Sequence, residues 1–189
     1  MCKLCKECGY KLILKFNSTL YYPCPRCKQI KKIINKQNKP FKASKNFNLY
    51  NSTPWKWLSH YVLLFYADSQ NMVKCSTSPH LEYKVNDKNI HVGHYIKYKD
   101  GNSTNNSTAL DFYNLAPQNA RDNTKLGGMP EVMREFLVSV HGEEKIKEIE
   151  ARKKIPLKLD VVYLQEISDR YKHLFNELLK ERGIENPWK

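Results

Sequence analysis

The most regular hydrophobic pattern in the chain is helical, and it occurs near residue 60 and again near the C-terminal end. Thr53 and Pro54 favour a helix start, because a capping hydroxyl and a proline at the first helical position both do so. Apolar side chains then recur every three or four residues, which predicts an amphipathic helix over 54–67. These side chains are Trp55, Leu58, Tyr61, Val62 and Phe65. A second stripe predicts a long helix over 158–182, whose apolar face either packs on the rest of the chain or pairs with a second copy.

The pattern between these two helices is mixed. Alternating apolar and polar residues predict extended chain over 73–98, and a polar run predicts a loop over 99–108. A short strand is expected at 113–118, and shorter helices at 130–140 and 143–153. Helices and strands that are separate in this way predict an α+β fold.

Positive charge is concentrated in the N-terminal third. Residues 1–60 contain 13 Lys and Arg and a single acid, Glu7, whereas residues 61–189 contain 19 basic and 18 acidic residues. The formal net charge of +13 indicates a polyanionic partner. The longest apolar run, 61–67, is far shorter than the roughly 20 residues that a membrane-spanning helix needs. No secretory signal is expected, so the chain is assigned to the cytoplasm, where thiols are reduced, with no membrane partner.

Four cysteines near the start have the spacing of zinc ligands. They form the pairs Cys5-x2-Cys8 and Cys24-x2-Cys27, and four thiolates can close a tetrahedron around Zn²⁺. A site closed in this way stabilises a fold and leaves no open position for catalysis. The alternatives are free cysteines, or a zinc site that uses Cys2 with Cys5 as its first pair.

The cysteine pairs and the charge together divide the chain into three parts. Residues 1–28 are expected to form a four-cysteine zinc-ribbon module, 29–53 a basic linker or DNA-facing arm, and 54–189 the core. The first two parts would present basic side chains to the phosphates of a nucleic acid, although a merely solvated surface would have the same composition. These side chains are Lys3, Lys6, Lys11, Arg26, Lys28, Lys31 and Lys32.

Two histidines and two asparagines form the candidate site of the core. His91 and His94 lie three residues apart in extended chain, so their side chains point to opposite faces of a regular strand. Both can serve one site only if the strand kinks or bulges, and Gly93 permits this. Asn114 precedes a short strand and Asn123 lies at a following helix start. Surface or buried structural histidines are the alternative interpretation.

This order of elements resembles the HNH, or ββα-metal, nucleases, and in particular the NinG/Rap recombination endonucleases of lambda-like bacteriophages. The resemblance spans roughly residues 54–182, and it implies a zinc ribbon followed by an HNH-like core flanked by helices. The matching elements are Trp55-Lys56, the Gly93-His94-Tyr95-Ile96 run, Leu110-Asp111-x-x-Asn114-Leu115-x-Pro117-Gln118, Asn123 with the following Gly-containing turn, and His141-Gly142.

The resemblance also implies roles for the site residues. His94 would be the general base that takes a proton from the attacking water. One divalent ion, Mg²⁺ or Mn²⁺, would be held by His91 and Asn123 and would bind the scissile phosphate. Asn114 would hold the loop that carries the base. The side chains expected to contact phosphate in the core are Arg121 and Lys125.

The chain departs from this family at several ligand positions. The family usually has Asp at the position of His91 and His at the position of Ala116. It also has two cysteine pairs that bind a zinc in the core, and only Cys75 of these four positions is a cysteine here. The other three are Ser78, Asn119 and Asp122. A core zinc is therefore not expected, polar contacts or the N-terminal module would replace its stabilising effect, and a loss of catalysis is an alternative.

The function expected from these features is metal-dependent hydrolysis of phosphodiesters in branched DNA, such as Holliday junctions, during phage recombination in the host cytoplasm. Because such a nuclease cuts two strands, the resemblance favours a two-fold homodimer. The alternatives are a non-catalytic zinc-ribbon DNA-binding accessory protein with a vestigial nuclease core, and an RNA-binding zinc-ribbon protein. The aromatic side chains of the first helix are expected to belong to the core, with stacking on unpaired bases as the alternative, and Trp57 is the best candidate for stacking because it lies off the main apolar stripe.

Overall fold

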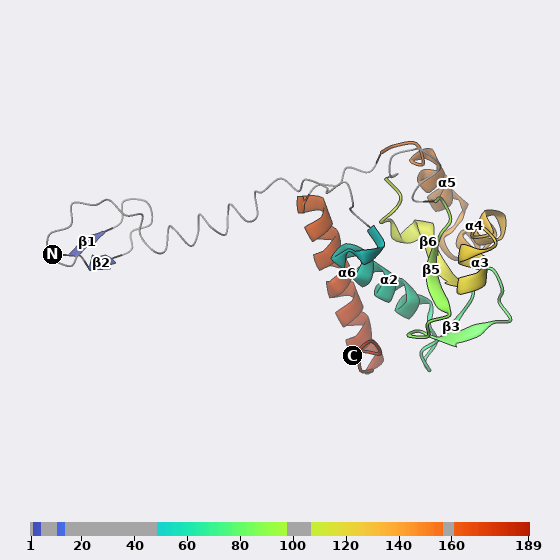
Figure 1. Ribbon diagram of the computed structural model, residues 1–189, viewed down its shortest axis with the longest axis horizontal. Coiled ribbons are helices and arrows are strands. Elements are labelled where there is room, and N and C mark those ends of the chain that lie inside the picture. The colour runs from blue at the N-terminus through green and yellow to red at the C-terminus, as the bar shows by residue number, and fades with distance from the viewer. Residues whose placement is uncertain (1, 5–10, 14–48, 98–106, 157–160) are drawn as a thin grey trace. The chain divides into compact units, whose positions relative to one another are not determined.

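A computed structural model of the chain describes residues 2–4, 11–13, 49–97, 107–156 and 161–189. The chain divides into two units, residues 1–42 and residues 43–189 (Figure 1). No helix within the described ranges is long and apolar enough to cross a membrane.

The first unit contains a short antiparallel hairpin. Strand β1 (Cys2–Leu4) pairs with β2 (Lys11–Ile13), and Leu4 lies opposite Lys11. All four expected zinc ligands, Cys5, Cys8, Cys24 and Cys27, lie outside the described residues. So do most of the basic side chains expected to contact phosphate, namely Lys6, Arg26, Lys28, Lys31 and Lys32. The zinc site and these basic contacts therefore stay predictions.

The second unit combines helices with short antiparallel hairpins, which confirms the α+β class. Strand β3 pairs with β4 and strand β5 pairs with β6. In chain order the elements are η1 (Leu49–Asn51), α2 (Thr53–Tyr66), β3 (Met72–Lys74), β4 (Glu82–Lys84), β5 (Ile90–His94), η2 (Phe112–Asn114), β6 (Leu115–Asn119), α3 (Ala120–Thr124), α4 (Pro130–His141), α5 (Glu143–Ala151) and α6 (Val161–Arg182).

Helix α2 begins at the predicted place but with a different cap. The hydroxyl of Ser52 accepts a hydrogen bond from the backbone N–H of Trp55 at 3.4 Å, and Thr53 is already helical. The predicted cap at Thr53 is therefore wrong by one residue. Ser52 takes this position because its backbone is extended, with φ −86° and ψ 151°, as a capping residue requires.

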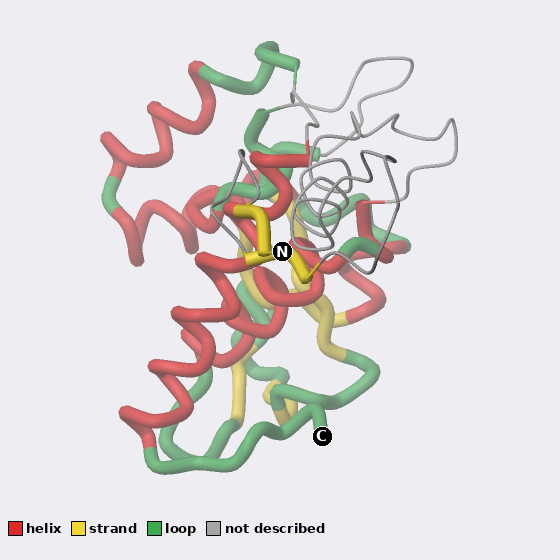
Figure 2. Tube along the Cα trace, turned by 90° about the vertical axis from the view of Figure 1, so that its left-hand side faces the viewer, coloured by secondary structure: helices red, strands yellow, loops and turns green. Residues whose placement is uncertain are grey.

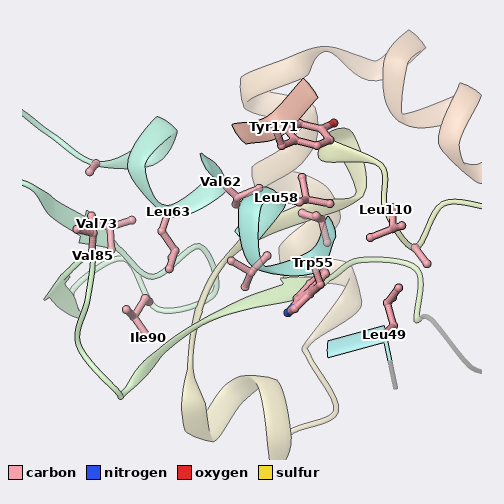
Figure 3. Packing of buried hydrophobic residues seen from close by; sticks show 14 of the residues in the cluster. Leu49, Trp55, Leu58, Val62, Leu63, Val73, Val85, Ile90, Leu110 and Tyr171 are labelled. Atoms are coloured by element: carbon pink, nitrogen blue, oxygen red, sulfur yellow. The ribbon is translucent and has the colours of Figure 1, made fainter. Parts of the chain in front are cut away.

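The main hydrophobic core is built around α2 (Figure 3). Helix α6 runs alongside α2 (Figures 1 and 2), and Tyr171 of α6 lies close to Leu58 and Val62. The apolar stripe of the last helix thus packs within the chain, the first of its two expected alternatives, and a homodimer stays a prediction. Leu49 is fully buried in the same core, so the end of the range expected to be a linker contributes to the folded unit.

The β5–β6 hairpin separates two groups of helices. Helix α2 contacts the hairpin from one side, and α3 contacts it from the other (Figure 1). The pairing is one-to-one from Ile90 opposite Asn119 to His94 opposite Leu115. Strand β5 therefore has no bulge. The sequence analysis required a kink or bulge for His91 and His94 to serve one site, and the strand does not meet this requirement.

Gly93 has a different role from the one expected. A methyl group added at Gly93 would overlap Oε1 of Gln118, whose side chain is fully buried beside it. The side chain of Gln118 lies against Gly93, and its Nε2 donates a hydrogen bond to the carbonyl of Gly128 at 2.6 Å. A glycine is needed here because a buried side chain crosses the strand, and not because the strand bends.

Gly93→Ala is expected to lower the free energy of unfolding by about 1–3 kcal/mol, the usual cost of overpacking a close-packed site. Urea denaturation of the full chain measures this loss. Gln118→Ala removes the overlapping atoms, so Gly93→Ala should cost much less in that background than in the wild type. Equal costs in the two backgrounds would show that Gln118 does not set the requirement for glycine.

Candidate functional site at the β5–β6–α3 corner

The hairpin and the helix after it form a ββα corner, consisting of β5, β6 and α3. Asn119 ends β6 and caps α3, because its Oδ1 accepts a hydrogen bond from the N–H of Asp122 at 3.0 Å. The chain therefore turns directly from strand into helix. This turn brings Nδ2 of Asn123 to 3.4 Å from Nδ1 of His91, although the two residues are 32 positions apart. Both side chains are half-buried.

His94 occupies a different environment from His91. Its ring is stacked on Trp55 with 5.0 Å between the centroids and 12° between the planes, and Tyr50 meets it edge-on at 6.0 Å. Nε2 of His94 lies 2.9 Å from the carbonyl oxygen of Ala109. Since a carbonyl only accepts, Nε2 carries the hydrogen and Nδ1 keeps its lone pair.

Burial sets the protonation of His94. Desolvation lowers the pKa of this imidazole to about 4, and the hydrogen bond to Ala109 opposes the shift only in part. The ring is therefore neutral near pH 7, with its hydrogen on Nε2 and a lone pair on Nδ1.

The two histidines lie on opposite sides of β5. Regular alternation along the strand places side chains three residues apart on opposite faces, and the contacts agree with this: His91 meets α3, whereas His94 meets Trp55 of α2. The structure thus brings together His91 and Asn123 of the expected site. It places His94 on the other face, at the end of the strand.

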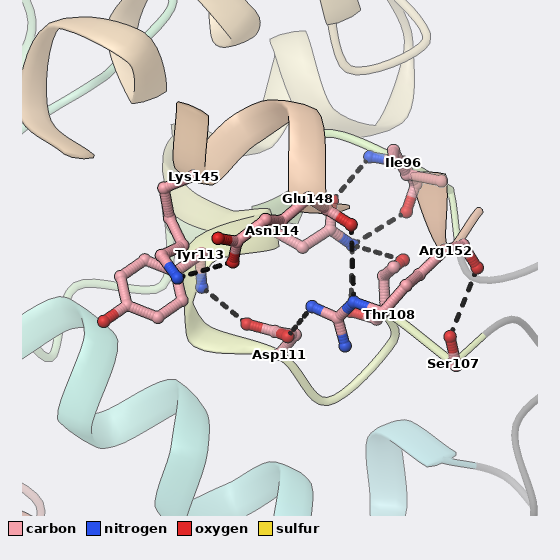
Figure 4. A network of polar contacts seen from close by, with 9 residues as sticks. All are labelled: Ile96, Ser107, Thr108, Asp111, Tyr113, Asn114, Lys145, Glu148 and Arg152. Atoms are coloured by element: carbon pink, nitrogen blue, oxygen red, sulfur yellow. Dashed lines mark hydrogen bonds and ion pairs between the residues drawn. The ribbon is translucent and has the colours of Figure 1, made fainter. Parts of the chain in front are cut away.

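Asn114 connects two segments next to His94 (Figure 4). It is fully buried, and its Nδ2 donates to the carbonyls of Ile96 and Thr108, each at 3.0 Å. Its Oδ1 accepts from the N–H of Ile96 at 2.7 Å. Because Thr108 precedes Ala109, this one side chain positions both the segment after β5 and the carbonyl that holds His94.

A second polar group supports the same segment. The carboxylate of Asp111 accepts from the N–H of Tyr113 at 3.1 Å and pairs with Arg152, the C-cap of α5, at 2.5 Å (Figure 4). The Tyr95 hydroxyl donates to Glu150 at 2.7 Å, and Arg134 pairs with the same carboxylate at 2.7 Å. The sequence analysis gave these residues no role, although Tyr95 and Asp111 stand in the matching elements, because no local spacing links them to their partners in distant segments.

The four positions at which the resembling family binds a core zinc do converge. Sγ of Cys75 lies 3.3 Å from Nδ2 of Asn119 and 3.8 Å from Oδ2 of Asp122, and Oγ of Ser78 lies 2.9 Å from the same Oδ2. Thr77 adds a further hydrogen bond to this carboxylate at 2.7 Å. One thiol among these side chains does not make a structural zinc site, which requires several Cys or His ligands.

A buried carboxylate therefore occupies the centre of this cluster. Burial raises the pKa of Asp122, but hydrogen bonds from Thr77 and Ser78 outweigh that effect, and the net shift is downward. Asp122 is only 4% exposed. The ionised carboxylate thus joins the Cys75–Ser78 turn after β3 to the start of α3, next to Asn123.

Few side chains in the corner could bind a metal ion. Ala116, where the family usually has His, is fully buried with Met133 and Leu137, so this position provides no ligand. In the described part of the chain, no group of three or more His, Cys, Asp or Glu side chains could hold a metal. A metal at the corner would therefore depend on His91 and the amide of Asn123.

Exposed basic side chains occur on α3 and at its end. Arg121 is exposed on α3, and Lys125 is exposed at its C-cap, so both expected phosphate contacts lie within two residues of Asn123. Nζ of Lys97 comes within 3.9 Å of the place that a Cβ on Gly127 would occupy. The sequence analysis did not single out Lys97, because its closeness to Gly127 arises only from the way the segment after α3 folds back toward the end of β5.

No family model, curated protein or solved structure matches the chain. Roles for the residues of the ββα corner therefore depend on its geometry: the hairpin register, the His91–Asn123 contact, and the hydrogen bonds of Asn114 and His94.

Proposed function

We propose that this protein is a metal-dependent endonuclease of the HNH type that hydrolyses phosphodiesters in branched DNA. The observation that supports this most directly is the contact between His91 and Asn123, which joins a strand and a helix at the edge of a ββα corner. An imidazole nitrogen and an amide oxygen are acceptable ligands for a divalent transition metal, and the exposed Arg121 and Lys125 belong to the same helix and its C-cap. A bound ion would stabilise the negative charge that develops on the phosphate.

The proposed base is His94. The carbonyl of Ala109 holds its Nε2, so the lone pair on Nδ1 takes the proton of the attacking water. Asn114 keeps that carbonyl in place through Thr108. Because His94 is the last residue of β5, the scissile phosphate would have to reach both histidines around the end of this strand.

Cleavage of a labelled four-way DNA junction tests the proposal, with linear duplex, single-stranded DNA and single-stranded RNA as comparison substrates. We expect junction cleavage with Mn²⁺ to exceed that with Mg²⁺ by at least about tenfold, because Mg²⁺ prefers carboxylate and water ligands over a neutral His and Asn pair. A higher rate with Mg²⁺ alone would contradict the assigned ligands. Tighter binding to RNA than to the junction would favour the RNA-binding alternative.

A second candidate function is a non-catalytic DNA-binding protein with a vestigial nuclease core. Two observations favour it: the regular strand β5 directs His91 and His94 to opposite sides, and Ala116 is buried where the family usually has a histidine. Tight junction binding without cleavage in either metal would establish this alternative and exclude the enzyme.

A further inference from the structure

Trp57 lies on the side of α2 that faces α6. Trp55, two residues earlier, stacks on His94, and the helical rotation between them directs Trp57 away from the ββα corner. The Trp57 ring packs on Phe175 of α6, with 5.8 Å between the centroids, and on His60 at 6.2 Å. Trp57 is half-buried, so part of its indole remains accessible.

The aromatic surface continues beyond Trp57. His60 stacks on Trp188 with 4.2 Å between the centroids and 10° between the planes, and Trp188 also meets Phe175 at 5.7 Å. Burial and the nearby Lys56 lower the pKa of His60 to about 4, so this ring is uncharged near pH 7. We call this surface the α2–α6 patch; it comprises Trp57, His60 and Trp188 with Lys56 and Lys172, and its aromatic rings pack on the buried Phe175.

Two ammonium groups converge on one ring of the patch. Nζ of Lys56 lies 5.5 Å from the centroid of Trp57, and Nζ of Lys172 lies 5.6 Å from the same centroid. The two lysines come from different helices, and both are exposed. Among the ion pairs of the described residues neither lysine has a carboxylate partner, and α2 has no acidic residue. Both ammonium groups would attract an anion that approached this ring.

We infer that the α2–α6 patch binds a single-stranded segment of nucleic acid. The ring of Trp57 would stack with one unpaired base, while Lys56 and Lys172 contact the adjoining phosphates. Contacts of exposed ammonium groups with an aromatic ring are weak, so both lysines can leave the ring for phosphate at small cost. The inference extends the proposed function: a branched substrate with unpaired nucleotides would meet the patch as well as the ββα corner.

Binding of a labelled 15-nucleotide oligo-dT, without added divalent metal, tests the inference. Lys56→Gln/Lys172→Gln in the full chain should weaken this binding by about tenfold or more and should reduce the slope of log K against log salt by about 1.4, the value for two phosphate contacts on a single strand. Lys153→Gln/Lys154→Gln makes the same change in net charge on exposed lysines away from the patch, and it should have little effect.

Tryptophan fluorescence supplies an independent measurement. Oligo-dT should quench the wild-type emission, and Trp57→Phe, which keeps a ring packed on Phe175, should lose most of that quenching. The inference would be overturned if both lysine double variants weakened oligo-dT binding equally, or if the patch variants bound oligo-dT as the wild type does. Displacement of oligo-dT by an equal concentration of poly-glutamate would also overturn it. Because no step requires cleavage, loss of binding in the patch variants would support it even if the wild type cleaved no substrate.

Discussion

His94→Ala is expected to reduce junction cleavage by at least about 100-fold while leaving junction affinity nearly unchanged, since a general base contributes about 10²–10⁴ to a rate. The side chains that we propose to contact phosphate, Arg121 and Lys125 among them, are unaltered by this change. Single-turnover cleavage and a binding measurement without divalent metal separate the two effects. His80→Ala, at an exposed position, is the matched control and should retain the full rate.

The pH dependence of the wild type provides a second test of the same assignment. Desolvation lowers the pKa of His94 to about 4, so the neutral base is present throughout the range above that value. Protonation of His94 should therefore reduce the cleavage rate only as the pH falls through about 4. A decline in the rate that begins near pH 6.5, the ordinary pKa of histidine, would indicate that the base is solvated and is not His94 as placed against Trp55.

Asp122→Ala is expected to cost about 3 kcal/mol of the free energy of unfolding. A hydrogen bond to a buried charged group typically contributes about 1.5–3 kcal/mol, and this carboxylate accepts from Thr77 and Ser78 at 2.7 and 2.9 Å. Without it, the turn after β3 loses its connection to α3. Urea denaturation measures the loss, and Glu135→Ala, which removes an exposed carboxylate, should change stability by less than about 0.5 kcal/mol.

The contribution of Asp122 should also depend on pH in a defined direction. Its pKa in the folded protein is lowered below the ordinary value of about 4, so its stabilising effect is complete above that pH. As the pH falls further, the unfolded chain takes up the proton first, and the effect disappears as the pH passes the pKa of the folded state. The difference in stability between wild type and Asp122→Ala should thus be constant above about pH 5 and shrink below it. A constant difference down to pH 2 would exclude the ionised carboxylate as the cause.

The helices were the part of the fold that local pattern could predict. The expected spans 54–67, 130–140 and 143–153 correspond to α2, α4 and α5 within about two residues, and 158–182 corresponds to α6. Apolar stripes, prolines and glycines determine such elements, because each of these effects acts within one or two turns. The position of Asn114 before a short strand was also predicted correctly.

The strands show where local pattern was insufficient. Alternation continues to residue 98, yet β5 ends at His94. The reason is Asn114, whose side-chain amide accepts a hydrogen bond from the N–H of Ile96 and donates one to its carbonyl. These backbone groups therefore bond to a side chain and not to a neighbouring strand. A hydrogen bond between residues 18 positions apart has no signature in the spacing of either segment.

By itself, the sequence determined the α+β class, the main helices and the basic N-terminal third, and it supplied candidate residues for a site. The tertiary structure decided how those residues combine. Register and packing placed His91 with Asn123 and His94 against Trp55, and they gathered Cys75, Ser78 and Asn119 around Asp122. Helical periodicity is local, whereas the protonation of His94 and the partners of Asp122 depend on burial by segments far away in the chain.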